Sequence, residues 1–115
     1  MDITENKKTS LKDNEIKALM RFKELLLERY SLVDIKLFGS KARGLDTPDS
    51  DIDILIEIEE LSPEIETEIG HIAFEINLEY NCFISTIIFS RKELEEGPLS
   101  ESPLYKNVQY EGVKI

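Results

Sequence analysis

The chain has 115 residues, of which 41% are hydrophobic and 33% are charged, and its formal net charge is −10. This length and composition predict one soluble globular domain, 1–115, rather than a disordered chain. No apolar run approaches the roughly 20 residues that cross a bilayer, and the N-terminus has no apolar signal segment. We therefore expect no membrane partner and a cytoplasmic location, which the single cysteine, Cys82, also fits.

The acidic balance limits the class of ligand. An extended nucleic-acid surface needs clustered Lys and Arg, so we expect none in this chain. A single nucleotide held through a metal ion is not excluded, and the negative charge also suits a basic protein partner.

The first third of the chain predicts a helix and a strand. Residues 1–9 are polar and lack periodicity, which predicts a loose N-terminal arm. Apolar residues then recur at helical spacing over 16–30, with Ser10 as the expected N-cap and Asp13 completing a capping box. Alternating apolar and polar residues over 33–38 indicate a short strand with one buried face.

The middle of the chain predicts two more strands around a second helix. Isoleucines alternate with other residues over 52–58, which indicates a strand after a polar loop. Ser62 as N-cap and Pro63 at the first helical position begin a helix that we expect to stop at Asn81. Residues 83–89 are mostly β-branched or aromatic and indicate a third, buried strand.

The C-terminal part, 97–115, predicts a loop and a short helix. The element order helix, strand, strand, helix, strand predicts an α+β (α/β-type) fold. We expect a small mixed β-sheet flanked by helices on one side.

The stretch between the first two strands carries residues suited to phosphate and metal chemistry. Gly39 and Ser40 leave the first strand, ten residues (41–50) follow, and Asp51 and Asp53 open the second strand. Residues two apart on a strand point to the same side, so both carboxylates face one way with Cα atoms roughly 6.5–7 Å apart. Like charges so placed repel unless a cation such as Mg²⁺ lies between them.

The Gly-Ser turn supplies the complementary feature. If residues 40–43 begin a helical turn, their free N–H groups form an anion site. The Ser40 hydroxyl adds a donor, and Lys41 or Arg43 can add positive charge. Either motif alone is more often a solvated strand start or an ordinary turn. Together, on adjoining strands, they indicate phosphoryl or nucleotidyl transfer.

This combination resembles a known family motif. Gly39-Ser40, ten residues and Asp51-Ile52-Asp53 resemble the motif of the nucleotidyltransferase superfamily that includes DNA polymerase β, in particular its minimal nucleotidyltransferase (MNT) branch. Lys41-Ala42-Arg43-Gly44 and Ser50 also resemble that branch, and the resemblance covers about residues 14–90.

The resemblance implies the nucleotidyltransferase fold and an NTP, ATP in the first place, bound as its Mg²⁺ complex. The implied reaction transfers a nucleoside monophosphate to a hydroxyl and releases pyrophosphate. Asp51 and Asp53 would be catalytic metal ligands, and Gly39, Ser40 and Arg43 would bind the triphosphate. An alternative role for Arg43 is to pair with an aspartate and order the loop.

The resemblance is incomplete at the third strand. The family pattern has a third carboxylate there, which completes the metal site and can activate the acceptor, but residues 80–92 contain no Asp or Glu. Glu75 or Glu79 on the preceding helix is a candidate substitute.

Two functions therefore stay open. The first, which we favour, is an enzyme that modifies a hydroxyl on a protein, an RNA end or a small molecule. The second is an inactive nucleotide-binding module acting as an antitoxin or partner subunit. Minimal family members often pair with a helical HEPN-domain protein in toxin–antitoxin systems. The resemblance thus implies such a partner, or a homodimer, that completes the acceptor site.

Overall fold

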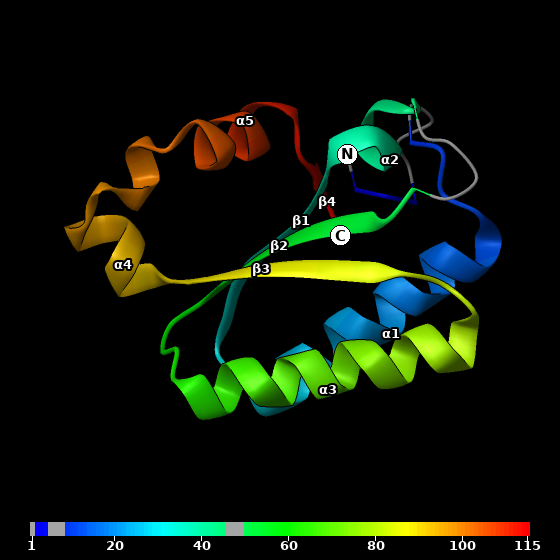
Figure 1. Ribbon diagram of the computed structural model, residues 1–115, viewed down its shortest axis with the longest axis horizontal. Helices are drawn as coiled ribbons and strands as arrows, with labels where there is room; N and C mark the ends of the chain where they lie inside the picture. Colours follow the sequence, from blue (N-terminus) through cyan, green and yellow to red (C-terminus); the bar gives the residue numbers. More distant parts are fainter. Residues whose placement is uncertain (1, 5–8, 46–49) are drawn as a thin grey trace.

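The computed structural model describes residues 2–4, 9–45 and 50–115. They form a central sheet with helices on both of its faces (Figure 1). In chain order the elements are α1 (Asp13–Arg29), β1 (Leu32–Phe38), α2 (Gly39–Arg43), β2 (Ile52–Ile58), α3 (Pro63–Tyr80), β3 (Ile84–Ser90), α4 (Arg91–Glu96), a 3₁₀ helix η1 (Pro98–Glu101), α5 (Pro103–Glu111) and β4 (Val113–Lys114). No helix among the described residues has the length and apolar character needed to cross a membrane.

The sheet has four strands in the order β3-β2-β1-β4 and is mixed, which confirms the predicted fold class. β1 pairs antiparallel with β2 and with β4, whereas β2 and β3 run parallel. A parallel pair needs a crossover connection rather than a tight turn, and α3 supplies it. Asp53 thereby lies between Phe38 of β1 and Ser85 of β3, in one row across the sheet.

One face of the sheet carries the hydrophobic core. Alternation along β2 directs Ile52, Ile54, Ile56 and Ile58 to this face, where each is fully buried. They belong to the same apolar cluster as the buried side chains of α1 and α3. Figure 1 shows both helices beneath the sheet. The amphipathic helices and the alternating strand predicted from the sequence thus meet as expected.

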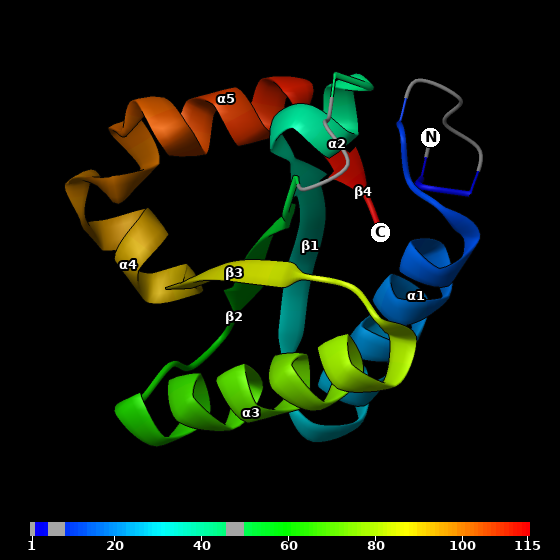
Figure 2. The ribbon, with the colours of Figure 1, turned by 45° about the vertical axis from the view of Figure 1, so that its right-hand side comes forward.

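The opposite face is covered by α5 at one end and α2 at the other, as Figure 2 shows. Tyr105 of α5 meets Phe89 of β3 edge-on, with ring centroids 6.2 Å apart. Gln109 Oε1 of α5 accepts a 2.7 Å hydrogen bond from Lys36 Nζ of β1. The prediction that helices cover one side only is therefore wrong.

The start and end of α3 follow the predicted signals. Ser62 Oγ accepts the backbone N–H of Ile65, and Pro63 occupies the first turn, where its missing N–H costs nothing. Asn81 ends the helix with a φ of 54°, in the left-handed region that Asn tolerates better than most residues.

The start of α1 differs from the prediction. Lys12 is the N-cap, and its N–H donates to Glu15 Oε1 at 2.8 Å. Ser10, the predicted cap, instead donates its backbone N–H to the carbonyl of Lys41 at 3.0 Å. This long-range contact ties the segment before α1 to the turn after β1.

The N-terminal arm is not loose at Ile3. This side chain is 2% exposed within the apolar core, and its N–H donates to Lys114 O at 2.8 Å. The sequence did not predict this burial, because Ile3 stands alone among polar residues and belongs to no apolar pattern. The other parts of the predicted arm at 1 and 5–8 lie outside the described residues.

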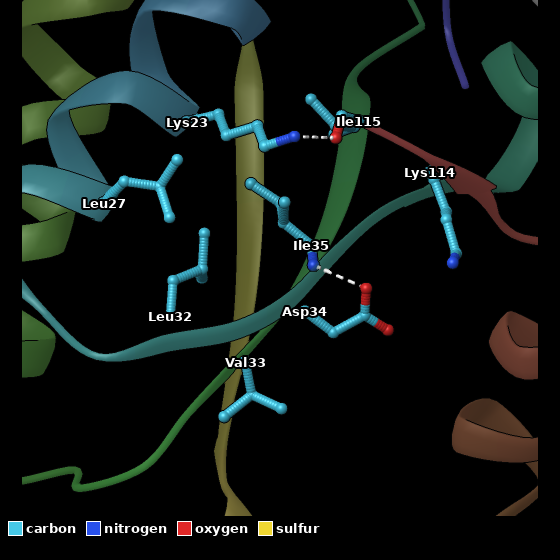
Figure 3. A pocket seen from close by; sticks show the side chains of 8 residues that line it. All are labelled: Lys23, Leu27, Leu32, Val33, Asp34, Ile35, Lys114 and Ile115. Carbon is cyan, nitrogen blue, oxygen red and sulfur yellow. Dashed lines mark hydrogen bonds between the residues drawn. The ribbon is translucent and has the colours of Figure 1, made fainter.

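β4 is a short strand that the sequence pattern does not predict. It extends the sheet beyond β1, and Ile115 N–H donates to Ile35 O at 3.2 Å. Figure 3 shows this edge, where Lys23 Nζ donates to Ile115 O at 2.6 Å beside a small hollow. The hollow lies between α1, β1 and β4, and its lining does not include the candidate site residues.

Candidate functional site

The predicted Gly-Ser turn is a short helix between two glycines with positive φ. β1 ends at Phe38, Gly39 has a φ of +75°, and α2 continues to Arg43. Gly44, with a φ of +70°, then closes the helix. The prediction of a helical turn at this place is confirmed. Because the first N–H groups of a helix have no intrahelical partner, this turn offers backbone donors at the end of β1.

Gly39 lies directly against the first part of β2. A Cβ atom built on residue 39 would stand 2.5 Å from Asp53 Oδ2, a separation that real Cβ contacts do not show. Any other residue would therefore strain the backbone and also collide with the Asp53 carboxylate. The two halves of the motif, ten residues apart in the chain, are in contact in the fold.

Asp51 and Asp53 lie at the start of β2, on the face opposite the core. Asp51 precedes the strand and is exposed, whereas Asp53 is half-buried in the row between Phe38 and Ser85. Burial raises the pKa of the Asp53 carboxyl, and the nearby Asp51 charge raises that pKa further. The site therefore holds a partly desolvated negative charge next to a second one, which favours a bound cation.

Lys41 does not supply charge to this site. Its side chain is 1% exposed and its Nζ lies 3.1 Å from a carboxylate oxygen of Glu15 in α1. The expectation that Lys41 could contact a phosphate is wrong, because its ammonium group is used in this buried ion pair. The pair fixes α2 to the N-terminal turn of α1.

Arg43 is at the end of α2 and remains accessible. Its side chain is 51% exposed, and its guanidinium lies 4.0 Å from Glu111 Oε2 at the end of α5. At this separation and exposure the pair is weak. Among the described residues Arg43 thus pairs weakly with Glu111 and not with an aspartate, and its guanidinium is accessible to an anion.

Ser85 lies on β3, the strand on which the family pattern predicts a third carboxylate. It pairs with Asp53 in the parallel register and shares its face, whereas the neighbouring Thr86 points to the core face. Glu75 and Glu79 are exposed on α3, which covers the core face, so the sheet separates both from Asp53. Neither glutamate takes the place of the third carboxylate.

Comparison with known proteins identifies the family. The model of the nucleotidyltransferase domain family matches residues 19–113, which is most of the chain and includes the whole motif. The chain belongs to the nucleotidyltransferase domain family.

Individual relatives agree with this assignment. Two proteins of Methanocaldococcus jannaschii, provisionally named protein adenylyltransferases, are each 48% identical over 48 residues, or 41% of this chain. The chain spans about half the length of these curated relatives, 48% and 49%. A solved structure provisionally described as a minimal nucleotidyltransferase superposes with a TM-score of 0.59 over 92% of this chain and 99% of the other, at 22% identity. This likeness confirms the nucleotidyltransferase fold.

The carboxylates of this nucleotidyltransferase domain fit a hard divalent cation. Mg²⁺ typically takes one or two carboxylates from the protein and keeps its other positions for water and substrate phosphates. Asp51 and Asp53 meet that requirement, and the raised pKa of Asp53 shows the electrostatic strain that a cation relieves. Within the described ranges no group of three or more His, Cys, Asp or Glu side chains that could hold a metal ion occurs.

Proposed function

We propose that this domain transfers AMP from ATP to a hydroxyl group on a protein, with Mg²⁺ held by Asp51 and Asp53. Family membership supports nucleotidyl transfer, and the provisional names of the M. jannaschii relatives favour adenylyl transfer to protein. We further propose that the acceptor is a partner chain, such as a helical HEPN-domain toxin.

The contact between Gly39 and Asp53 carries this proposal. It places the first turn of α2 beside the Asp53 carboxylate, on the face of the sheet opposite the core. A triphosphate could thus meet backbone donors and the Ser40 hydroxyl on one side and a carboxylate-bound cation on the other. Arg43, half exposed at the end of α2, can add positive charge to this site.

In the proposed reaction the acceptor oxygen forms a bond to the α-phosphorus, and the bond from that phosphorus to the bridging oxygen breaks. Pyrophosphate leaves, and the acceptor proton passes to water or to a base of the acceptor protein. When bound, Mg²⁺ supplies neutralisation of the developing charge on the phosphates. The residues of α2 and β2 orient the triphosphate, because such catalysis is largely positioning and charge stabilisation.

Ser85 favours a second candidate function. The residue paired with Asp53 on β3 is a serine and not a carboxylate. A serine hydroxyl is a poor base near neutral pH, so this position does not supply a group that could deprotonate the acceptor. A domain with this site could bind Mg²⁺ and ATP without turnover and act as an antitoxin or regulatory subunit. The same assay separates the two functions.

The test is incubation with α-³²P-labelled ATP and Mg²⁺, with and without the product of the neighbouring gene. Asp53→Asn removes one metal ligand and keeps the side-chain shape. Glu57→Gln is the matched control, because Glu57 lies on the same face of β2 but outside the motif. We expect label on the partner with the wild type and with Glu57→Gln, and at least 100-fold less with Asp53→Asn.

Three further outcomes are informative. Equal labelling by Asp53→Asn would overturn the assignment of the metal site. Absence of label, with Mg²⁺-dependent ATP binding that Asp53→Asn loses, would replace the enzyme by the binding module. Absence of both labelling and ATP binding in the wild type would overturn both candidate functions.

A further inference from the structure

The outward face of α3 carries a stripe of exposed apolar side chains. Phe74 is 63% exposed and Leu78 is 70% exposed, and the two residues are one turn apart on the helix. Just beyond the end of α3, Phe83 is also 70% exposed and borders with them a groove of about 400 Å³. Figures 1 and 2 show α3 on the outside of the molecule, with the sheet on its inner side. Contiguous exposed apolar surface of this kind marks an interaction site.

Gly70 extends this stripe by one turn toward the N-terminus of α3. Glycine inside a helix costs stability relative to alanine, because it loses more backbone freedom on folding. Gly70 is exposed, and a Cβ atom built on it would meet no atom of the described structure within 4 Å, so the fold does not require a glycine here. What a glycine offers at this position is room for the backbone of another molecule to approach α3 closely. An amphipathic helix suits such a stripe, because its side chains at i, i+3 or i+4, and i+7 contact one face.

The rim of the stripe is acidic. The helix has no Lys or Arg, and its glutamates are Glu64, Glu66, Glu68, Glu75 and Glu79. All of them are exposed, and in the part of the chain that the structure describes none of them forms an ion pair. Arg21 of the neighbouring α1 pairs with Glu24 of its own helix at 3.0 Å. On the other side of the groove, residues 81–90 carry no charge. The stripe thus has an apolar centre and a negative rim that no cation of the described chain pairs with.

We propose that this stripe binds an amphipathic helix of a partner protein, with apolar side chains on one face of that helix and Lys or Arg beside them. The apolar side chains of the partner helix lie against Phe74, Leu78 and Phe83, and its backbone approaches at Gly70. Its basic flanks face the glutamates of α3, so the charges are complementary. A second copy of this chain, with its net charge of −10, and an anionic membrane surface lack that complementarity.

The docking stripe is separate from the nucleotide site. α3 packs on the core face of the sheet, whereas Asp53 lies on the opposite face. A partner held at α3 therefore leaves the region around Gly39 and Asp53 accessible to a nucleotide. The docking goes beyond the proposed transfer reaction and requires neither Mg²⁺ nor ATP.

The test is an NMR titration of the ¹⁵N-labelled whole chain with a synthetic helical peptide, without nucleotide or Mg²⁺. The probe peptide has leucine at helical spacing on one face and lysine on both flanks, and a second peptide has glutamate in place of every lysine. We expect the lysine peptide to shift the amide signals of Gly70, Phe74, Leu78 and Phe83. It should bind at least tenfold more tightly than the glutamate peptide.

A double variant separates docking from general attraction to an acidic protein. Phe74→Ser/Leu78→Ser keeps the net charge and changes two exposed side chains, so it should stay folded and bind the lysine peptide at least tenfold more weakly. The matched control is Met20→Ser/Leu27→Ser. It removes side chains of α1 that are 43% and 56% exposed, and it should bind the peptide like the wild type.

Gly70→Gln provides an independent check. Glutamine is a better helix former than glycine and has room at this position, so the variant should melt at a higher temperature than the wild type. It should also bind the lysine peptide at least tenfold more weakly, because the new side chain occupies the place where the partner backbone approaches. A position that matters only for folding would not combine higher stability with weaker binding.

Four outcomes would overturn the proposal. Undiminished binding of the lysine peptide to Phe74→Ser/Leu78→Ser would mean that net charge alone attracts it. Equal binding of the glutamate peptide would exclude a basic partner. Self-association of the wild type that Phe74→Ser/Leu78→Ser abolishes, measured by sedimentation equilibrium, would assign the stripe to a second copy. Failure of both peptides to bind would exclude helix docking. Each of these results is independent of whether the domain transfers a nucleotide.

Discussion

Individual charged side chains buried in this domain are held in two different ways. Lys41 and Glu15 form an ion pair with both side chains removed from water. Glu57 is half-buried on the face of β2 opposite the core, which α5 covers, and Asp34 of β1 is its cross-strand neighbour. The opposite charges of Lys41 and Glu15 offset the cost of removing both from water. Glu57 instead lies beside the like charge of Asp34. The two arrangements predict opposite responses to mutation.

Replacing Lys41 should strongly destabilise the fold. In Lys41→Met the Glu15 carboxylate stays buried without its ammonium partner, and breaking such a pair costs about 3–5 kcal/mol. Urea unfolding measures the loss. Adding Glu15→Gln should restore most of it, because Gln still accepts the N–H of Lys12 and carries no charge.

Lys17→Met is the control for Lys41→Met, since Lys17 is an exposed lysine on α1. It should change the free energy of unfolding by about 0.5 kcal/mol or less. A Lys41→Met variant as stable as Lys17→Met would show that the pair does not support the fold.

Neutralising Glu57 should stabilise the fold in a pH-dependent way. Burial raises the pKa of this carboxyl, Asp34 raises it further, and Arg91 partly lowers it. The native state therefore binds more protons than the unfolded chain between the ordinary and the raised pKa, and stability falls as pH rises through that range. At neutral pH Glu57→Gln should melt roughly 2–4 °C higher than the wild type, and this difference should disappear below the ordinary pKa of a glutamate.

Thermal melts of both proteins across that pH range test this expectation. Tyr105→Phe serves as a control, because it leaves the acidic pair in place and should not change the shape of the pH dependence. A Glu57→Gln variant whose advantage is the same at low and neutral pH would contradict the electrostatic explanation.

At the scale of elements, the sequence predicts those helix and strand boundaries that depend on residues close together in the chain. The period-2 pattern of β2, the Ser62-Pro63 start of α3 and the Asn81 stop all appear as expected, because each depends on neighbours in the chain. β4 did not have such a signal: two residues carry no detectable period, and pairing with β1 across some 77 residues creates the strand. The burial of Ile3 depends on β4 in turn.

In the candidate site, too, the sequence predicts features that depend on spacing along the chain and misses those that depend on tertiary contacts. The sequence predicts Gly39, Ser40, Asp51 and Asp53 from spacing, and the structure brings Gly39 into contact with Asp53. It does not predict that Lys41 pairs with Glu15, 26 residues earlier, since either lysine or arginine after Ser40 reads as a phosphate ligand. The position of Ser85 beside Asp53 also requires the parallel register of β2 and β3.

At the scale of the whole molecule, a net charge of −10 makes every cation stabilising to some degree. Self-repulsion among the carboxylates is screened by any salt, so NaCl alone should raise the melting temperature. A specific Mg²⁺ site is therefore recognised by a rise in melting temperature larger than the one that charge screening alone produces. Asp51 and Asp53 provide that distinction, because their charges are close together and Asp53 is partly desolvated.

Millimolar MgCl₂ should stabilise the wild type more than NaCl of the same ionic strength. Binding to the native state alone adds about 1.4 kcal/mol at a tenfold excess over the dissociation constant, or roughly 5 °C in melting temperature. Asp53→Asn should lose this specific part and keep the part due to screening. It should also melt slightly above the wild type without Mg²⁺, since it removes the repulsion from Asp51. If the wild type melts at the same temperature in MgCl₂ and in NaCl, the two aspartates hold no cation in the absence of nucleotide. The same comparison in the presence of ATP would then test whether the triphosphate is needed to complete the site.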